Sequence, residues 1–334
     1  MAADGSAVRE QVFIDDDSTV WIYPSDPELP ALREVVEPTS ASAILGGLGV
    51  TTEVRAVRVV TYRPGRRAVV RVEATSGCFY LKVVEPVKAA AIAERHQQFR
   101  ESSLPVPRLL GWSQDGVIAM SELPGIDAQS AVARMDDPAA FLDQVEFLTT
   151  LLAGVPAFNT ARGSLVDRLD WYIERLSRHL PDEAERIATT GGRISRCIAQ
   201  GRSGSHTSVT VHGDLHLGQL FVDPENLGHI TGMLDIDTAG VGDPADDAAA
   251  FYSHLIALGE TARAQDPAYS AACDRLAEGW RSRWLRNRNA GFANRATAIA
   301  ATHLLGHALR PLTADAHIVS VRLLDHAQRL VNDW

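Results

Sequence analysis

The hydrophobic pattern of this 334-residue chain changes at one breaker sequence, Leu123-Pro124-Gly125. Before it, short runs rich in Val, Tyr and Phe alternate with turns that contain Pro or Gly, which is typical of antiparallel strands. After it, longer segments show the spacing of amphipathic helices. This order predicts an α+β fold with a sheet-rich first part and a mostly helical second part. The breaker is the predicted boundary between them.

The first part divides further. Residues 51–123 form the predicted sheet domain, and residues 1–50 precede it as a lead-in or cap segment with a strand at Thr19–Tyr23 and helical residues in Pro30–Leu48. Five strands and one helix are predicted in the sheet domain, in the chain order Val54–Tyr62, Ala68–Ala74, Cys78–Val84, helix Pro86–Glu101, Leu109–Trp112 and Val117–Met120.

The second part, residues 124–334, is predicted to be helical apart from one β island between Thr207 and Asp235. Asp137 precedes a proline at the start of one helix, as an N-cap residue does. The assigned helices are Pro138–Leu152, Ser164–Leu180, Pro181–Gln200 and Ala245–Ala262, with three further helical segments up to Trp334.

Composition excludes several classes of protein. The formal net charge of −10 argues against nucleic-acid binding, which needs clustered Lys and Arg. The isolated cysteines Cys78, Cys197 and Cys273 lack the spacing of a disulfide framework or a cysteine zinc site. The polar, acidic start does not resemble a secretory signal, and no apolar stretch is long enough to cross a bilayer. We therefore expect a cytoplasmic protein that has no membrane partner.

The β island carries the residues that could take part in a reaction or bind a metal ion. A hairpin that turns near residue 227 places Gln219 opposite Asp235, at about 5 Å across the strands. An amide oxygen and a carboxylate at that separation can share one Mg²⁺. Asp214 lies one short loop before Gln219. An aspartate that accepts a hydroxyl proton, beside oxygen ligands for Mg²⁺, is what phosphoryl transfer requires.

The order of these motifs resembles the aminoglycoside and choline phosphotransferase branch of the kinase-like superfamily. The matching residues are His212-Gly213-Asp214, Gln219, Asp235 and Gly242-Asp243-Pro244 with Asp247, and the resemblance runs from about Val54 to Phe251. It implies a two-lobed protein-kinase-like fold with an antiparallel-sheet N-lobe that binds nucleotide, a mostly helical C-lobe that binds the acceptor, and an active site in the cleft between them. Its implied partners are a nucleotide and a polar small-molecule acceptor.

In the C-lobe, the resemblance implies that Asp214 is the catalytic base and that Gln219 and Asp235 are ligands of Mg²⁺. The catalytic loop sequence His-Gly-Asp-Leu-His-Leu-Gly-Gln is similar to that of maltokinase-like members, which favours a sugar, an amino sugar or an aminoglycoside-like acceptor. The family usually has Asn at the position of Gln219, whose side chain is longer by one methylene.

In the N-lobe, the resemblance implies that Lys82 holds the α- and β-phosphates of ATP or GTP and that Glu94 orients Lys82. The backbones of Ser121 and Leu123 fall where the family binds the adenine ring. The turn over the phosphates, Tyr62–Arg67, lacks the glycine triplet of protein kinases.

Two other functions fit parts of the pattern. His212, Asp214, His216 and Asp235 are residue types that form dinuclear metallohydrolase sites. A catalytically silent kinase-like binding module would share the fold without the reaction. Asp247, which follows the motif Gly242-Asp243-Pro244, is expected, like Asp243, to serve the start of a helix.

Overall fold

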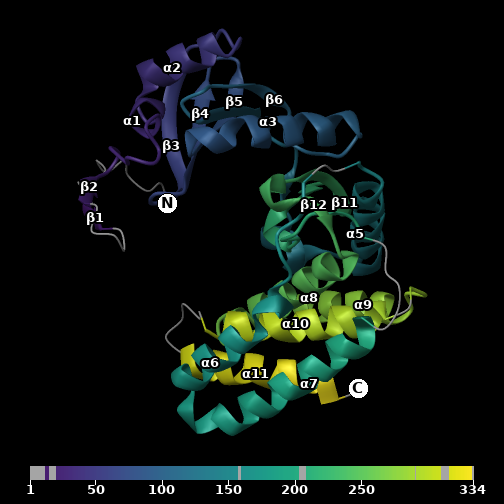
Figure 1. Cartoon of the computed structure of the whole chain (residues 1–334). Helices are drawn as coiled ribbons and strands as arrows, with labels where there is room; N and C mark the ends of the chain where they lie inside the picture. Colours follow the sequence, from purple (N-terminus) through teal and green to yellow (C-terminus); the bar gives the residue numbers. More distant parts are fainter. Residues whose placement is uncertain are drawn as a thin grey trace. The chain divides into compact units, whose positions relative to one another are not determined.

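The computed structural model describes residues 12–14, 20–156, 159–202, 208–289, 291–309 and 316–332 (Figure 1). The chain divides into two compact units, Met1–Leu123 and Pro124–Trp334. Most of the strand residues of the described chain lie in the first unit, and most of the helical residues lie in the second. The predicted α+β class is confirmed.

The first unit contains a five-stranded antiparallel sheet with strand order β3-β4-β5-β7-β6. Every predicted strand of this region is present. The strands are β3 (Val54–Arg63), β4 (Arg67–Ala74), β5 (Gly77–Val84), β6 (Leu109–Trp112) and β7 (Val117–Ser121). Because these strands are consecutive or separated by one helix, short turns at Pro64-Gly65 and Thr75-Ser76 suffice to pair the first three.

Each face of this sheet packs against helices. One face buries a core that includes Leu81 and Val83 of β5 together with residues of α1 (Leu32–Val35) and α2 (Pro38–Gly47). The other face packs Ile118 and Met120 against α3 (Pro86–Glu101). Side chains alternate between the faces of a strand, so each face has its own apolar set.

The lead-in contributes to the first unit in two ways. Its predicted strand corresponds to β2 (Val20–Ile22), which pairs with β1 (Val12–Ile14); Thr19 lies outside the described residues. Asp26 Oδ2 then accepts hydrogen bonds from the Tyr62 hydroxyl and the Gly65 backbone N–H, both at 2.8 Å. The buried Asp26 carboxylate thereby ties the lead-in to the turn between β3 and β4.

The second unit is built from helices, and its core lies around α8 and α10 (Figure 1). Predicted helices are present with shifted ends, and Asp137 caps α5 by accepting the Ala140 N–H at 3.0 Å. The helices are α4 (Ala128–Ala131), α5 (Pro138–Ala153), α6 (Leu169–His179), α7 (Ala184–Arg202), α8 (Pro244–Ala262), α9 (Pro267–Leu285), α10 (Phe292–Ala308) and α11 (Ala316–Asn332). In the part of the chain that the structure describes, no helix combines the length and the apolar character needed to cross a bilayer.

The strands of the β island form two small antiparallel sheets with two short strands from outside it, β8 and β12. One has strand order β11-β10-β8, and the other pairs β12 with β9. The strands are β8 (Ile126–Asp127), β9 (Val209–Val211), β10 (Leu220–Asp223), β11 (Asn226–Met233) and β12 (Gly240–Gly242). Thr207, at the predicted start of the first strand, lies outside the described residues.

Candidate active site

The loop that carries Asp214 begins where β9 ends, and a buried carboxylate fixes its backbone. Asp247, on the first turn of α8, accepts the His212 N–H through Oδ2 at 2.7 Å and the Gly213 N–H through Oδ1 at 2.8 Å. Asp247 is 3% exposed. Both oxygens therefore bind the backbone just before Asp214, and Asp247 has a positioning role beyond the helix start expected from sequence.

Gly213 is required by the shape of this loop. Its φ of 80° lies in the left-handed region, and a Cβ built there would lie 2.7 Å from the Thr238 carbonyl oxygen. Thr238 also donates its hydroxyl to the His212 carbonyl at 2.9 Å. The glycine of the His-Gly-Asp sequence thus permits a close approach of two backbone segments that a side chain would block.

His212 links the loop to the neighbouring hairpin. Its side chain is fully buried, and Nε2 lies 2.8 Å from the Leu234 carbonyl oxygen. Leu234 directly precedes Asp235. One imidazole therefore connects the segment that holds Asp214 to the segment that holds Asp235.

Asp214 is half-buried and pairs with Arg162, which no sequence motif marks. Arg162 Nη1 lies 3.5 Å from Asp214 Oδ1, and the two side chains are 44% and 30% exposed. The Arg162 backbone N–H donates to the Thr238 carbonyl at 3.1 Å. Arg162 lies in an irregular segment before α6, and only the tertiary fold brings it to the loop.

Gln219 and Asp235 come together, although the expected pairing is wrong by one residue. Leu220 pairs with Met233, and the Leu234 N–H donates to the Gln219 carbonyl at 2.7 Å, so Gln219 is opposite Leu234. Register shifts within the β10–β11 hairpin cause the difference. The Gln219 amide nevertheless reaches Asp235, with 3.5 Å between Nε2 and Oδ2.

Asp235 has a left-handed backbone conformation, of the kind that is enriched at functional sites. Its φ of 52° and ψ of 47° are left-handed, which a non-glycine residue rarely adopts. The chain there leaves β11 and enters the 3₁₀ turn Ile236–Thr238. Rotation of the Gln219 amide by half a turn about its terminal carbon–carbon bond directs the amide oxygen, instead of the nitrogen, to Asp235. The donor set of amide oxygen and carboxylate fits a hard divalent cation.

In the first unit, Lys82 lies on β5 and is 5% exposed. It pairs with Ile118 of β7 and therefore shares the sheet face that α3 covers. Leu81 and Val83 face the opposite core, because side chains alternate along the strand.

The expected partner of Lys82 is not placed to orient it. Glu94 is exposed on α3. The buried stripe of α3 consists of Ala89, Ile92, Ala93, His96 and Phe99. Since successive helical residues rotate by about 100°, Glu94 lies on the side of α3 opposite this stripe. His96 is the buried polar residue that α3 presents among its described side chains.

The proposed adenine contacts lie at the end of β7. The Ser121 N–H donates to the Arg108 carbonyl at 3.0 Å, and the Ser121 hydroxyl accepts the Arg108 N–H at 3.1 Å. Ser121 therefore already uses its backbone donor within the sheet edge. Leu123 is half-buried and is the last residue of the first unit.

The histidines of the loop are engaged in ways that argue against a dinuclear metallohydrolase. His216 Nδ1 accepts the Gly218 N–H at 3.1 Å, while His212 bonds to Leu234. Burial lowers the pKa of His216, and the nearby carboxylates of Asp214 and Asp235 act against this shift. Among the described residues, His212, Asp214, His216 and Asp235 do not make up a cluster whose ligand atoms could share a metal ion.

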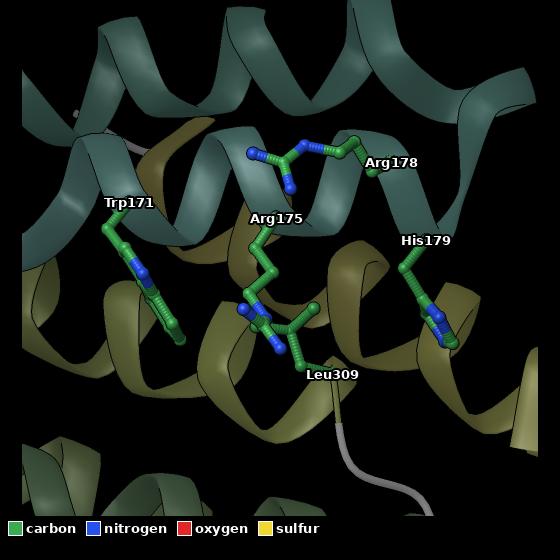
Figure 2. A pocket seen from close by; sticks show the side chains of 5 residues that line it. All are labelled: Trp171, Arg175, Arg178, His179 and Leu309. Carbon is green, nitrogen blue, oxygen red and sulfur yellow. The ribbon is translucent and has the colours of Figure 1, made fainter. Parts of the chain in front are cut away.

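A separate cavity of 590 Å³ lies between α6 and the end of α10 (Figure 2). Trp171, Arg175 and His179 extend from the same side of α6, while Arg178 lies apart from them and Leu309 closes the cavity from the end of α10. The guanidinium carbons of Arg168 and Arg175 lie 4.6 and 5.2 Å from the Trp171 ring centroid. Like-charge repulsion makes this cavity a poor site for a polycationic acceptor.

Comparisons with known proteins agree with this geometry. The sequence profile of the phosphotransferase enzyme family matches residues 52–283. A search of curated protein sequences found no match.

Solved structures of aminoglycoside phosphotransferases resemble the chain in fold. The GDP complex of aminoglycoside 2'-phosphotransferase-IIIa is 13% identical, with a TM-score of 0.58 over 89% of this chain and 100% of that one. A thermostable mutant of aminoglycoside phosphotransferase APH(4)-Ia, in its apo form, is 14% identical, with a TM-score of 0.56 over 87% of this chain and 97% of that one. At these identities the likeness concerns the fold, and it confirms the predicted protein-kinase-like class.

Proposed function

The chain belongs to the phosphotransferase enzyme family, and from this premise we propose that it is a small-molecule kinase. In this proposal the γ-phosphoryl group of ATP or GTP is transferred to a hydroxyl group of a sugar, an amino sugar or an aminoglycoside-like acceptor. The observation that carries the proposal is the fixed position of Asp214. Asp247, Thr238 and His212 hold its loop, and the Gln219–Asp235 pair follows directly.

The catalytic step follows from these positions. Asp214 accepts the proton of the acceptor hydroxyl as that oxygen forms a bond to the γ-phosphorus. The bond between the γ-phosphorus and the bridging oxygen breaks, and the nucleoside diphosphate leaves. Arg162 Nη1, at 3.5 Å from Asp214 Oδ1, holds a cation beside this carboxylate.

Gln219 and Asp235 would hold Mg²⁺, which neutralises charge on the phosphate oxygens when it is bound. Their own contribution is to present an amide oxygen and a carboxylate from adjacent points of one hairpin. Lys82, buried on the α3 face of its sheet, is proposed to bind the α- and β-phosphates as a cation. The backbones of Ser121 and Leu123 are proposed to contact the base of the nucleotide. Glu94 is exposed, which does not favour the role of orienting Lys82 that the resemblance implies.

Nucleotide and acceptor classes are supported by relatives of the same fold. A mutant of APH(4)-Ia was crystallised as a ternary complex with ADP and hygromycin B, and APH(2'')-Ib was crystallised with ADP. The carboxylates of Asp127 and Asp235 lie close enough to His216, in the Asp214 loop, to act on it electrostatically. Such a site favours an acceptor that is neutral or cationic over one that is anionic.

The test is a panel of sugars, amino sugars and aminoglycosides assayed for release of ADP or GDP, with the phosphorylated product identified by mass spectrometry. We expect one acceptor class to give Mg²⁺-dependent turnover, and Asp214→Asn to reduce that turnover at least about 10³-fold while nucleotide still raises the melting temperature. Full turnover by Asp214→Asn would refute the base. A nucleotide-dependent thermal shift with no product from any acceptor would instead support a silent binding module.

A further inference from the structure

Three histidines gather in the core of the second unit, apart from the residues assigned to phosphoryl transfer. His254 lies on α8, and His303 and His307 lie on α10. These two helices pack against each other (Figure 1). His303 and His307 are one turn apart, so their side chains lie on the same face of α10. That face is the one turned to His254.

The side-chain nitrogens are close enough to share one ion. One ligand atom from each histidine lies within 4.8 Å of the other two. The ring centroids of His254 and His307 are 4.5 Å apart, and His303 lies 6.5 Å from each of them. Nitrogens that bind zinc tetrahedrally at about 2.1 Å are about 3.4 Å from one another. Small rotations of the three rings would close this difference.

The surroundings favour neutral imidazoles, the form that binds metal. Desolvation by burial lowers the pKa of His303 to about 3 and lowers that of His254 well below its ordinary value. The cation facing both rings is Arg162, which opposes a bound metal ion electrostatically. Arg162 is also within 3.5 Å of the Asp214 carboxylate, which offsets much of that charge.

We propose that His254, His303 and His307 form a binding site for a divalent transition metal ion, with Zn²⁺ as the ion that the ligand set fits. Imidazole nitrogen suits Zn²⁺, whereas Mg²⁺ prefers oxygen ligands and would remain at the Gln219–Asp235 pair. Three protein ligands leave a fourth position for water. The site is therefore distinct in chemistry from the magnesium site proposed above.

The proposed metal site contacts the loop that carries Asp214 through a pair of stacked histidine rings. The rings of His254 and His216 are stacked, with centroids 4.4 Å apart and an interplanar angle of 23°. His216 is in turn fixed to the Gly218 N–H and follows Asp214 by one intervening residue. A metal ion that holds the His254 ring would restrict His216, and through it the Asp214 loop.

The experiment measures Zn²⁺ alone, by isothermal titration with the full chain after chelator treatment, without a histidine tag, nucleotide or acceptor. Its result therefore does not depend on whether the protein is a kinase. We expect one Zn²⁺ per chain, bound at least about tenfold more weakly by His307→Ala and not detectably by His303→Leu. Substitution of Co²⁺ should give the visible absorption bands of a low-coordinate nitrogen site.

Two further variants make the result decisive. His229→Ala removes an exposed histidine of β11 and should bind Zn²⁺ as the wild type does. Asp235→Ala should also retain it, because that residue belongs to the proposed magnesium pair. Circular dichroism identifies any variant that does not fold, and His307→Ala, which removes a half-buried ring, provides a milder alternative to His303→Leu. Equal affinity in His307→Ala and wild type, or loss of Zn²⁺ in Asp235→Ala alone, would overturn the proposal.

Discussion

At the residue scale, Asp247 shows how a side chain outside the proposed reaction sets the position of the loop that carries Asp214. Its two oxygens accept the His212 and Gly213 N–H groups at 2.7 and 2.8 Å. An Asn at this position has one oxygen and one amide nitrogen, so one of the two donors would lose its acceptor. A buried donor without a partner costs about 1–3 kcal/mol.

We therefore predict that Asp247→Asn lowers kcat by at least about tenfold and changes the KM for nucleotide much less. Steady-state kinetics with an acceptor identified by the panel measures both. Asp246→Asn is the matched control, since Asp246 is adjacent on α8 and bonds to Ser164 instead of the loop. Equal losses of kcat in both variants would show that the loop contacts of Asp247 are not the cause.

Gln219 gives a second prediction at the residue scale. Its amide reaches to 3.5 Å from the Asp235 carboxylate. Gln219→Asn removes one methylene and withdraws the amide from that position, although Asn is the usual residue of the resembling family. The Mg²⁺ concentration for half-maximal activity should rise at least about fivefold, with a smaller effect on kcat.

The measurement is a Mg²⁺ titration at saturating nucleotide and acceptor. Gln129→Asn serves as the control, because Gln129 also lies beside this loop, next to Gly218, without being assigned to the metal. If Gln219→Asn has the Mg²⁺ dependence of wild type, the length of the Gln219 side chain does not determine metal binding.

At the element scale, α8 and α10 are joined by a buried ion pair. Arg295, 1% exposed, extends from α10 to Asp243, with Nε 2.5 Å from Oδ2 and Nη2 3.3 Å from Oδ1. Asp243 also caps α8 by accepting the Ala245 N–H at 3.0 Å. The sequence indicated the cap but not the pairing, because nothing in the pattern marked Arg295 as buried.

We predict that Arg295→Met destabilises the second unit by up to about 3–5 kcal/mol, since it leaves the Asp243 carboxylate, which is only 16% exposed, without its cation. Urea unfolding measures the change. Asp243→Asn retains the helix cap, so the double variant Arg295→Met/Asp243→Asn should be less destabilised than the sum of the two single changes. Strict additivity would mean that the pair contributes no coupling.

The strands and helices also show which features of the fold can be predicted from sequence and which cannot. The strands of the first unit were predictable because alternating side chains and turn residues are local signals. The β10–β11 register was not, since its irregularities leave no mark in the pattern and shift Gln219 by one residue. Glu94 was expected to face Lys82 and is instead exposed on α3, because the sequence does not show which face of that helix packs against the sheet. Arg162 was missed because only the tertiary fold brings its loop to Asp214.

At the scale of the whole molecule, several carboxylates gather near the start of α8. The chain carries a net charge of −10, and Asp246 lies among Asp243, Asp247 and Asp167. Burial, with a smaller contribution from these neighbours, raises the pKa of Asp246 to about 7, although the Ser164 hydroxyl donates to it at 2.6 Å. The folded state therefore keeps a proton on Asp246 that the unfolded chain has already lost at pH 5.

The sign of the pH effect follows from this difference. Below about pH 4 the carboxyl is protonated in both states and contributes no pH dependence. As pH rises from about 4 to 7 the native protein binds more protons than the unfolded chain, so the free energy of unfolding decreases, by no more than about 4 kcal/mol for this shift. Above about pH 7 the loss is complete.

Asp246→Asn removes this titration and retains an acceptor for Ser164. We predict that the variant and wild type unfold with similar free energies at pH 4, and that the variant becomes the more stable protein as pH rises to 7.5. Urea unfolding of the second unit at several pH values measures the difference in the free energy of unfolding between variant and wild type. The contributions of other titrating groups are common to both proteins and cancel in this difference. Asp182→Asn, an exposed position, should give a curve parallel to wild type. A parallel curve for Asp246→Asn as well would mean that the carboxylate carries its charge in the folded protein throughout this range.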